Sequence, residues 1–325
     1  MSCRQGAGAH CSNRVVQASR PLKGRGVSRR RLAWFLLLLS PALFGVNMLA
    51  ARYATFVPPN ALALGRWLLV ALLLLPFVWP RLRTNASALG REWPDILLFG
   101  ALGMWICGAF VYIGAHTTTA LNIGLIYAAS PILVVVLGRW LDREPLSAGR
   151  ILGIVLCLAG VAAVFTRGRV ANLLEVQFGV GDLWIAAGSA SWGLYSVLLR
   201  HRPSRFDPLT RLCLFSLAGS LILLPFALGE AILWDPPDLG DIRVWLAWLV
   251  IALVPGIGAY AAYAFCVAEL GPSRTSLAMY LGPPYVGVMA WVALGETPQW
   301  YHLLGIALVL PGLFLATRPG RPRTT

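Results

Sequence analysis

The charged residue with the clearest potential for chemistry is Arg66, which lies about six positions inside an apolar segment at 60–79. A guanidinium roughly 9 Å along such a helix is costly in lipid unless it is paired, hydrated or able to reach the interface. Arg66 therefore predicts either an anion-facing group beside a central cavity or a structural residue that hydrogen-bonds carbonyls of a neighbouring helix. Trp67, next to it, is a candidate for the same cavity.

Other candidates for a substrate pathway are polar or amphipathic side chains deep in apolar segments. A buried tyrosine hydroxyl or tryptophan N–H needs a hydrogen-bond partner, and ordinary helix packing is the competing interpretation for each of them. They are Asn47, Asn122, Tyr127, Trp192, Tyr195, Tyr260, Tyr280 and Tyr285.

Prolines also occur inside the apolar segments, at Pro131, Pro283 and Pro284. Proline removes an amide donor and clashes with the preceding helical turn, so it frees backbone carbonyls. Freed carbonyls are tolerated in lipid only where protein or a wet cavity covers them. We therefore expect these prolines to mark kinks that serve gating, with a merely packed kink as the alternative.

Carboxylates do not fall securely inside any apolar segment, so the sequence shows no buried proton relay. Glu144 and Glu296 lie in short loops, where we expect each to cap the following helix and complement its dipole. Asp182 is expected at an interface, and Glu230 is expected to be solvated together with the acidic loop at 235–241.

Cofactor and metal motifs give no support for an enzyme. The sequence contains no P-loop, His-Glu-x-x-His or paired Cys-x-x-Cys, so we expect no cofactor, no metal site and no ATP hydrolysis. Gly256-Ile-Gly258 resembles half of a dinucleotide fingerprint but lies within an apolar segment. Its glycines, like Gly149 and Gly153, are expected to allow close helix contact.

The elements that must position these residues are membrane helices. Hydrophobic residues make up 58% of the chain and charged residues 12%, against roughly 25% charged in soluble domains. A run of about 20 apolar residues crosses about 30 Å of hydrocarbon. Such runs predict an all-α membrane protein embedded in a lipid bilayer, with spans at 32–50, 60–79, 95–113, 119–138, 148–165, 182–199, 210–228, 244–266, 274–294 and 301–317.

The second half of the chain repeats the first. Four positions of the first half recur after 152 residues, and Gly45 and Arg52 recur after 148 as Gly193 and Arg200. Each copy holds five spans, and because five is odd the second copy must cross the bilayer in the opposite sense. We therefore predict ten transmembrane helices as two inverted five-helix repeats. The 152-residue pairs are Pro131 and Pro283, Glu144 and Glu296, Gly153 and Gly305, and Gly160 and Gly312.

The predicted domains are the repeats at 32–165 and 182–317, with a disordered basic tail at 1–31 and a short tail at 318–325. On the side that carries both termini we count 21 of the 27 Lys and Arg residues, against 4 on the other side. This asymmetry obeys the positive-inside rule and places both termini in the cytoplasm. The net charge of +14 thus orients the protein in a cell membrane and needs no nucleic-acid partner.

Several short stretches resemble a known family. The stretch Tyr280-Leu-Gly-Pro-Pro-Tyr285, then Leu294-Gly-Glu296 and Leu303-Leu-Gly, resembles the last two helices of EamA-type transporters of the drug/metabolite transporter superfamily. Gly65-Arg66-Trp67 and Ser191-Trp-Gly-Leu-Tyr195 are similar to that family as well. In the first copy, Asp142-Arg-Glu144 departs from the Leu-Gly-Glu pattern. The resemblance implies a ten-helix bundle that exports small metabolites or drugs.

The sequence thus favours a secondary transporter that exports small organic solutes, such as amino acids or drugs, across the cytoplasmic membrane by alternating access. Two alternatives stay open. One is a membrane-embedded enzyme acting on lipid or isoprenoid diphosphates, and the other is a non-transporting receptor. The substrate and the coupling ion are not specified by the sequence, and a homodimer is left open.

Overall fold

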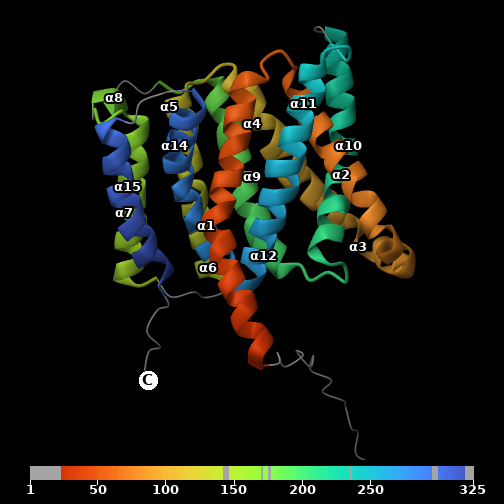
Figure 1. Ribbon diagram of the computed structural model, residues 1–325, viewed down its shortest axis with the longest axis horizontal. Coiled ribbons are helices and arrows are strands. Elements are labelled where there is room, and N and C mark those ends of the chain that lie inside the picture. The colour runs from red at the N-terminus through yellow and green to blue at the C-terminus, as the bar shows by residue number, and fades with distance from the viewer. Residues whose placement is uncertain are drawn as a thin grey trace, which may run out of the picture.

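The computed structural model describes residues 23–141, 146–169, 171–174, 177–233, 236–294 and 299–318, which form helices and contain no strand. The helices pack side by side in a bundle, and α1 begins at the same end of the bundle at which α15 finishes (Figure 1). We call this the terminal end and the other the far end. The elements are α1 (Lys23–Tyr53), α2 (Pro59–Thr84), α3 (Ala86–Phe99), η1 (Gly100–Ile106), α4 (Cys107–Ala115), α5 (Ala120–Ala128), α6 (Ser130–Leu141), α7 (Ala148–Phe165), α8 (Ala171–Leu174), α9 (Val180–His201), α10 (Pro208–Leu233), α11 (Ile242–Ile251), η2 (Ala252–Ala259), α12 (Tyr260–Leu270), α13 (Pro272–Leu277), η3 (Ala278–Leu281), α14 (Gly282–Leu294) and α15 (Trp300–Thr317).

Within the described residues, seven helical segments are long and apolar enough to cross a membrane by length and composition. The other predicted spans correspond to α1, α9 and the run from α13 to α14, which are helical but are not among those seven. Helix α1 begins at Lys23, earlier than the span at 32–50, so it includes part of the predicted tail. The seven segments are Pro59–Thr84, Ala86–Ala115, Asn122–Leu141, Ala148–Phe165, Pro208–Leu233, Ile242–Leu270 and Trp300–Thr317.

Helices α7 and α15 form a tight antiparallel pair at one edge of the bundle (Figure 1). A Cβ on Gly153 would lie 2.5 Å from both the Gly312 carbonyl oxygen and the Ala316 amide nitrogen. A Cβ on Gly160 would likewise lie 2.8 Å from the Gly305 oxygen. Glycine at these positions lets the two backbones touch, as in small-residue membrane interfaces. Gly149 behaves differently from its expected role, because nothing lies within 4 Å of its Cβ position.

Helices α2 and α10 form a second antiparallel pair, and polar side chains join them at both ends. At the far end, the Glu230 carboxylate of α10 accepts hydrogen bonds from the amides of Asn60 and Ala61 at 2.8 and 3.0 Å. These amides belong to the first turn of α2, which has no partner of its own for them. Glu230 is only 4% exposed, so the expectation that it is solvated is wrong.

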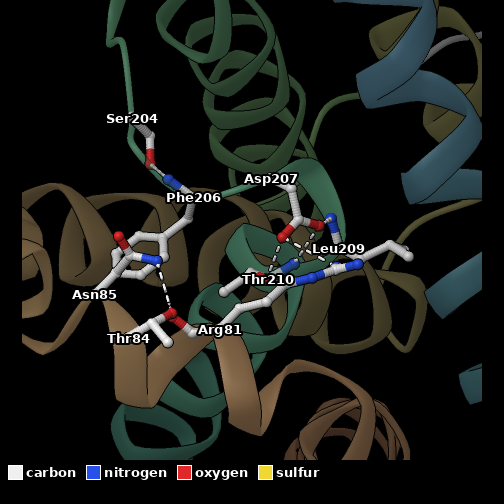
Figure 2. Close-up of polar contacts among 8 residues, drawn as sticks. All are labelled: Arg81, Thr84, Asn85, Ser204, Phe206, Asp207, Leu209 and Thr210. Carbon is white, nitrogen blue, oxygen red and sulfur yellow. Dashed lines mark hydrogen bonds and ion pairs between the residues drawn. The ribbon is translucent and has the colours of Figure 1, made fainter.

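At the terminal end it is the start of α10 that is capped, and α2 supplies the countercharge (Figure 2). Asp207 precedes α10 and accepts hydrogen bonds from the amides of Leu209 and Thr210 at 3.2 and 3.3 Å, and from the Thr210 hydroxyl. Arg81, near the end of α2, lies 3.2 Å from the same carboxylate. Partial burial raises the pKa of Asp207, but these hydrogen bonds and the charge of Arg81 outweigh it and hold the pKa below its ordinary value.

Replacing Asp207 with alanine should lower the free energy of unfolding at neutral pH by about 1 kcal/mol, the usual value of an N-cap side chain. Because the folded pKa is lowered, the stabilisation is present above the unfolded pKa of about 3.9 and is lost as the pH falls through the folded value. Unfolding in detergent at several pH values measures this. Asp207→Asn keeps a capping oxygen and should lie between the two, and a wild-type advantage that grows on acidification would contradict the assignment.

Each half also contains a π-helical segment at a repeat-related position. η1 starts at Gly100 and η2 at Ala252, which is displaced by the same 152 residues as the repeat. Carbonyls in η1 receive side-chain hydrogen bonds from the second half: Ser191 donates to Leu102 at 2.8 Å and Tyr260 to Gly103 at 2.9 Å. π-helical turns are often found at functional sites. The hydrogen bond from Tyr260 joins η1 to a residue that the sequence predicts for the substrate pathway.

The two proline positions coincide with interruptions of the helices. Pro131 is the second residue of α6, directly after the break between α5 and α6, while Pro283 and Pro284 follow the 3₁₀ turn η3. Two carbonyls before the first break accept side-chain hydrogen bonds: Ser189 donates to Ile126 at 3.1 Å, and Tyr280 to Ala128 at 2.9 Å. Side chains from the second half of the chain therefore cover backbone carbonyls on the N-terminal side of this break.

Candidate functional site

The candidate site surrounds Arg66, which is 3% exposed. Its NH1 donates to the Asn47 side-chain oxygen at 3.1 Å, and the Tyr112 hydroxyl lies 2.8 Å from the same oxygen. The guanidinium stands over two rings, 4.3 Å from the centroid of Trp67 and 5.6 Å from that of Tyr260. These three polar residues come from α1, α2 and α4, so first-half helices converge on one charge.

Arg66 forms no ion pair with any carboxylate in the part of the chain that the structure describes, and its Nε is buried without a hydrogen-bond partner. Insertion scales put a charge at the centre of a membrane helix at about 2.5–3.5 kcal/mol. Desolvated cation–π contacts contribute about 2 kcal/mol. The two rings and one amide are therefore of the size needed to offset the charge, although Nε itself keeps no hydrogen bond among the described residues.

Aromatic rings continue from Arg66 into the second half of the chain. Tyr260 contacts Trp67 with centroids 4.9 Å apart and Trp192 at 5.3 Å. Trp192 stacks on Tyr195 at 5.4 Å and contacts Tyr263 at 4.7 Å. We use "central cluster" for these rings and their polar neighbours: Phe44, Asn47, Arg66, Trp67, Tyr112, Trp192, Tyr195, Tyr260 and Tyr263.

Tyr127 lies at the margin of this cluster. Its neighbours include Cys107, Tyr112 and Tyr260, and its hydroxyl is 3.3 Å from the Cβ position of Gly188 on α9. Of the residues predicted from the sequence, the structure thus gathers seven around one centre: Asn47, Arg66, Trp67, Tyr127, Trp192, Tyr195 and Tyr260.

Other predicted residues lie elsewhere. Asn122 donates to Asp182 at 3.1 Å and to the Gln177 carbonyl at 2.9 Å, in a network with Thr118 at the start of α9. Asp182 lies in the first turn of α9, at the end of a helix as expected, and is 4% exposed because its partners cover it. Tyr280 covers the break after α5.

The remaining predictions concern helix starts and the second core. Tyr285 packs against the cluster of buried residues that contains Tyr280. Glu144 and Glu296 lie outside the described residues. In the described part, the N-cap positions of the helices that follow them are Ser147, which accepts from the Arg150 amide at 3.2 Å, and Gln299.

Phe44, Tyr112 and Tyr263 belong to the central cluster but were not predicted as site residues. Phe44 contacts three rings, those of Trp192, Tyr260 and Tyr263, at 5.4–6.1 Å. A phenylalanine in an apolar span carries no sequence signal that separates a site from a core. Tyr112 is different, because an intramembrane hydroxyl that must find a partner could have identified it.

Comparison with known proteins decides the family. The model of the EamA-like transporter family matches residues 31–166 and again residues 179–318. The chain belongs to the EamA-like transporter family. Its members are transporters and not enzymes, which removes the diphosphate-enzyme alternative. With the apolar helices, this membership makes the protein a multi-pass membrane transporter.

Relatives of this EamA-like transporter carry the same description. "Uncharacterized transporter YyaM" of Bacillus subtilis is 25% identical over 89% of this chain and 94% of its own. A "Probable terminal-alkyne amino-acid exporter" of Streptantibioticus cattleyicolor is 26% identical over 70% of this chain and 74% of its own. A solved crystal structure matches with a TM-score of 0.71 at 21% identity, covering 88% of this chain and 97% of that one, which shows a shared fold.

Proposed function

We propose that this protein is a secondary carrier that exports small organic solutes, such as amino acids or related metabolites, across the cytoplasmic membrane by alternating access. Its ten spans would form two inverted five-helix repeats with both termini in the cytoplasm. The observation that carries the proposal is the central cluster, where helices of both halves meet around a buried charge. A relative named as a probable amino-acid exporter supports the solute class.

The inverted arrangement draws support from contacts between repeat-related residues. Gly153 meets Gly312 and Gly160 meets Gly305, so exchanging each residue for its repeat partner maps one contact onto the other. Cys157 Sγ lies 3.7 Å from the carbonyl oxygen of Val309, its own repeat partner. Contacts of this kind are expected when a two-fold axis perpendicular to α7 and α15 relates the two antiparallel helices. In a membrane, such an axis lies in the bilayer plane, as in inverted-repeat carriers.

The packing of α2 against α10 fits a carrier with two gates. Glu230 holds the far end of the pair, and Asp207 with Arg81 holds the terminal end. The tryptophan and tyrosine rings of the central cluster are buried between these ends, as a carrier with both gates shut would have them. Rocking of one half against the other would then expose the cluster to one side at a time.

Counterflow in proteoliposomes tests this function. Vesicles containing the purified protein are preloaded with pooled amino acids and metabolites, and uptake of trace labelled solutes is measured against protein-free vesicles. Accumulation of at least one solute above its external concentration is the expected result. Saturable binding of a solute without any counterflow would instead establish a receptor and would overturn the proposal.

A further inference from the structure

The polar groups around Arg66 that lack partners are all hydrogen-bond donors. Arginine can only donate, so the Asn47 atom facing Arg66 NH1 must be its oxygen. The Tyr112 hydroxyl points to the same oxygen, which leaves the Asn47 amide nitrogen without a hydrogen bond among the described residues. Arg66 Nε is also buried and unpartnered. Arg66 Nε and the Asn47 amide nitrogen are therefore two donors of the same residue pair without an acceptor among the described residues.

This donor set has a specific chemical complement. The planar guanidinium fork fits the two oxygens of a carboxylate. The walls beyond it are the rings of Trp67, Tyr260 and Trp192, which suit an apolar or aromatic body. Within the described residues, no Asp or Glu belongs to the central cluster, so the cluster offers no countercharge for a cationic solute.

Resting on the proposed carrier function, we infer that Arg66 and Asn47 bind the carboxylate group of the transported solute. The substrates are then organic acids, including amino acids held through their carboxylate, with the aromatic rings around the rest of the molecule. Trp248 of α11 lies against Gly65, the residue before Arg66, and Arg66 itself is 3% exposed. The solute therefore enters only when the helices separate.

Asn47→Asp is the decisive variant because it supplies a built-in carboxylate 3.1 Å from Arg66 NH1. The new side chain keeps the shape of asparagine and pairs with the guanidinium, so the variant should fold with an unchanged or higher thermal midpoint. It should nevertheless lose carboxylate binding, since the site is already neutralised. Arg66→Gln also removes packing against two rings, so it is only a supporting variant. Asn85→Asp makes the same chemical change at the end of α2, outside the cluster, and serves as the control.

Equilibrium dialysis of the detergent-purified protein measures binding of phenylacetate, L-phenylalanine and pyruvate, with phenylacetamide and phenethylamine as neutral and cationic comparisons. At least one carboxylate should bind, and phenylacetate should bind about tenfold to a hundredfold more tightly than its amide, the range expected for hydrogen bonds to a charged group. Asn47→Asp should lose this preference, and Asn85→Asp should retain it. Equal binding of acid and amide, no binding of any carboxylate, or an unaffected Asn47→Asp variant would overturn the inference.

The two proposals fail in different ways. Carboxylate binding without counterflow leaves the site in place and removes the carrier function. Counterflow of neutral or cationic solutes without preference for carboxylates leaves the carrier and removes the carboxylate site. A structural role of Arg66 alone predicts that Asn47→Asp changes the thermal midpoint but not the ratio of acid to amide binding.

Discussion

Gly153→Ala should destabilise the folded protein by about 3 kcal/mol or more, the upper end of the range for overpacked sites. The added methyl carbon would lie 2.5 Å from the Gly312 carbonyl oxygen and the Ala316 amide nitrogen. These are backbone atoms that no rotamer change can move aside, so α7 and α15 would have to separate along their length. Unfolding in detergent, followed by loss of helicity, measures the change.

Gly149→Ala, one turn earlier on the same helix, is the matched control. Nothing lies within 4 Å of the Gly149 Cβ position, so the substitution brings only the helix-propensity gain of roughly 0.5–1 kcal/mol. The two substitutions thus have the same chemistry and opposite expected signs. Similar small effects at both positions would show that α7 and α15 are not in backbone contact.

Trp192→Ala should reduce counterflow by at least about tenfold while the protein remains folded. Trp192 contacts the rings of Phe44, Tyr195, Tyr260 and Tyr263. Each aromatic pair contributes about 0.5–1.5 kcal/mol beyond burial, and about 1.4 kcal/mol corresponds to a factor of ten. Without this ring, Tyr260 loses a neighbour that holds it against Arg66 and η1. Initial rates in proteoliposomes, normalised to folded protein, measure the effect.

Trp184 provides the control for this loss. It lies on the same helix, α9, but is 37% exposed, and the ring contact that the structure gives it is with Phe110. Trp184→Ala should keep at least half of the wild-type rate, an effect of no more than about 0.4 kcal/mol by the same conversion. Equal losses from both variants would assign Trp192 to general packing and remove it from the transport path.

The sequence was sufficient for the helices and the repeat because both depend on local patterns. Apolar runs such as 119–138 correspond to α5 and α6, and the glycine at 153 allows the expected close contact. The same pattern failed at Gly149, since a glycine spacing does not say which face of the helix meets a neighbour. That choice depends on helix rotation, which is set by packing across the whole bundle.

Burial of the acidic residues could not be predicted for the same reason. Glu230 looked solvated because it precedes an acidic loop, yet α10 runs antiparallel to α2 and places this carboxylate on the free amides of Asn60 and Ala61. Asp182 is similar, because its partners Thr118 and Asn122 come from a distant part of the chain. The sequence shows that the amides of a helix start need a hydrogen-bond acceptor. It does not show which distant side chain provides the acceptor, because that depends on the tertiary fold.

For the candidate site, the sequence identified a set of residues, and the fold shows which of them lie in the central cluster. Arg66 and Trp192 meet in the central cluster, whereas Tyr280 serves the break after α5. Each of these residues is an amphipathic side chain inside an apolar span, so composition cannot distinguish them. Only the tertiary arrangement of α1, α2, α4, α9 and α12 shows which of these side chains lie near the same charge.

The central claim is that two related halves lie in opposite orientations around a common site. Ser147 and Gln299 occupy the N-cap positions of α7 and α15 and are repeat partners, both exposed. Single cysteines at these two positions, in a background without other cysteines, are treated in intact cells with a membrane-impermeant maleimide. We predict that Gln299→Cys is labelled from outside and Ser147→Cys only after the membrane is permeabilised. Labelling of both cysteines from the same side would contradict the inverted arrangement and the alternating-access carrier built on it.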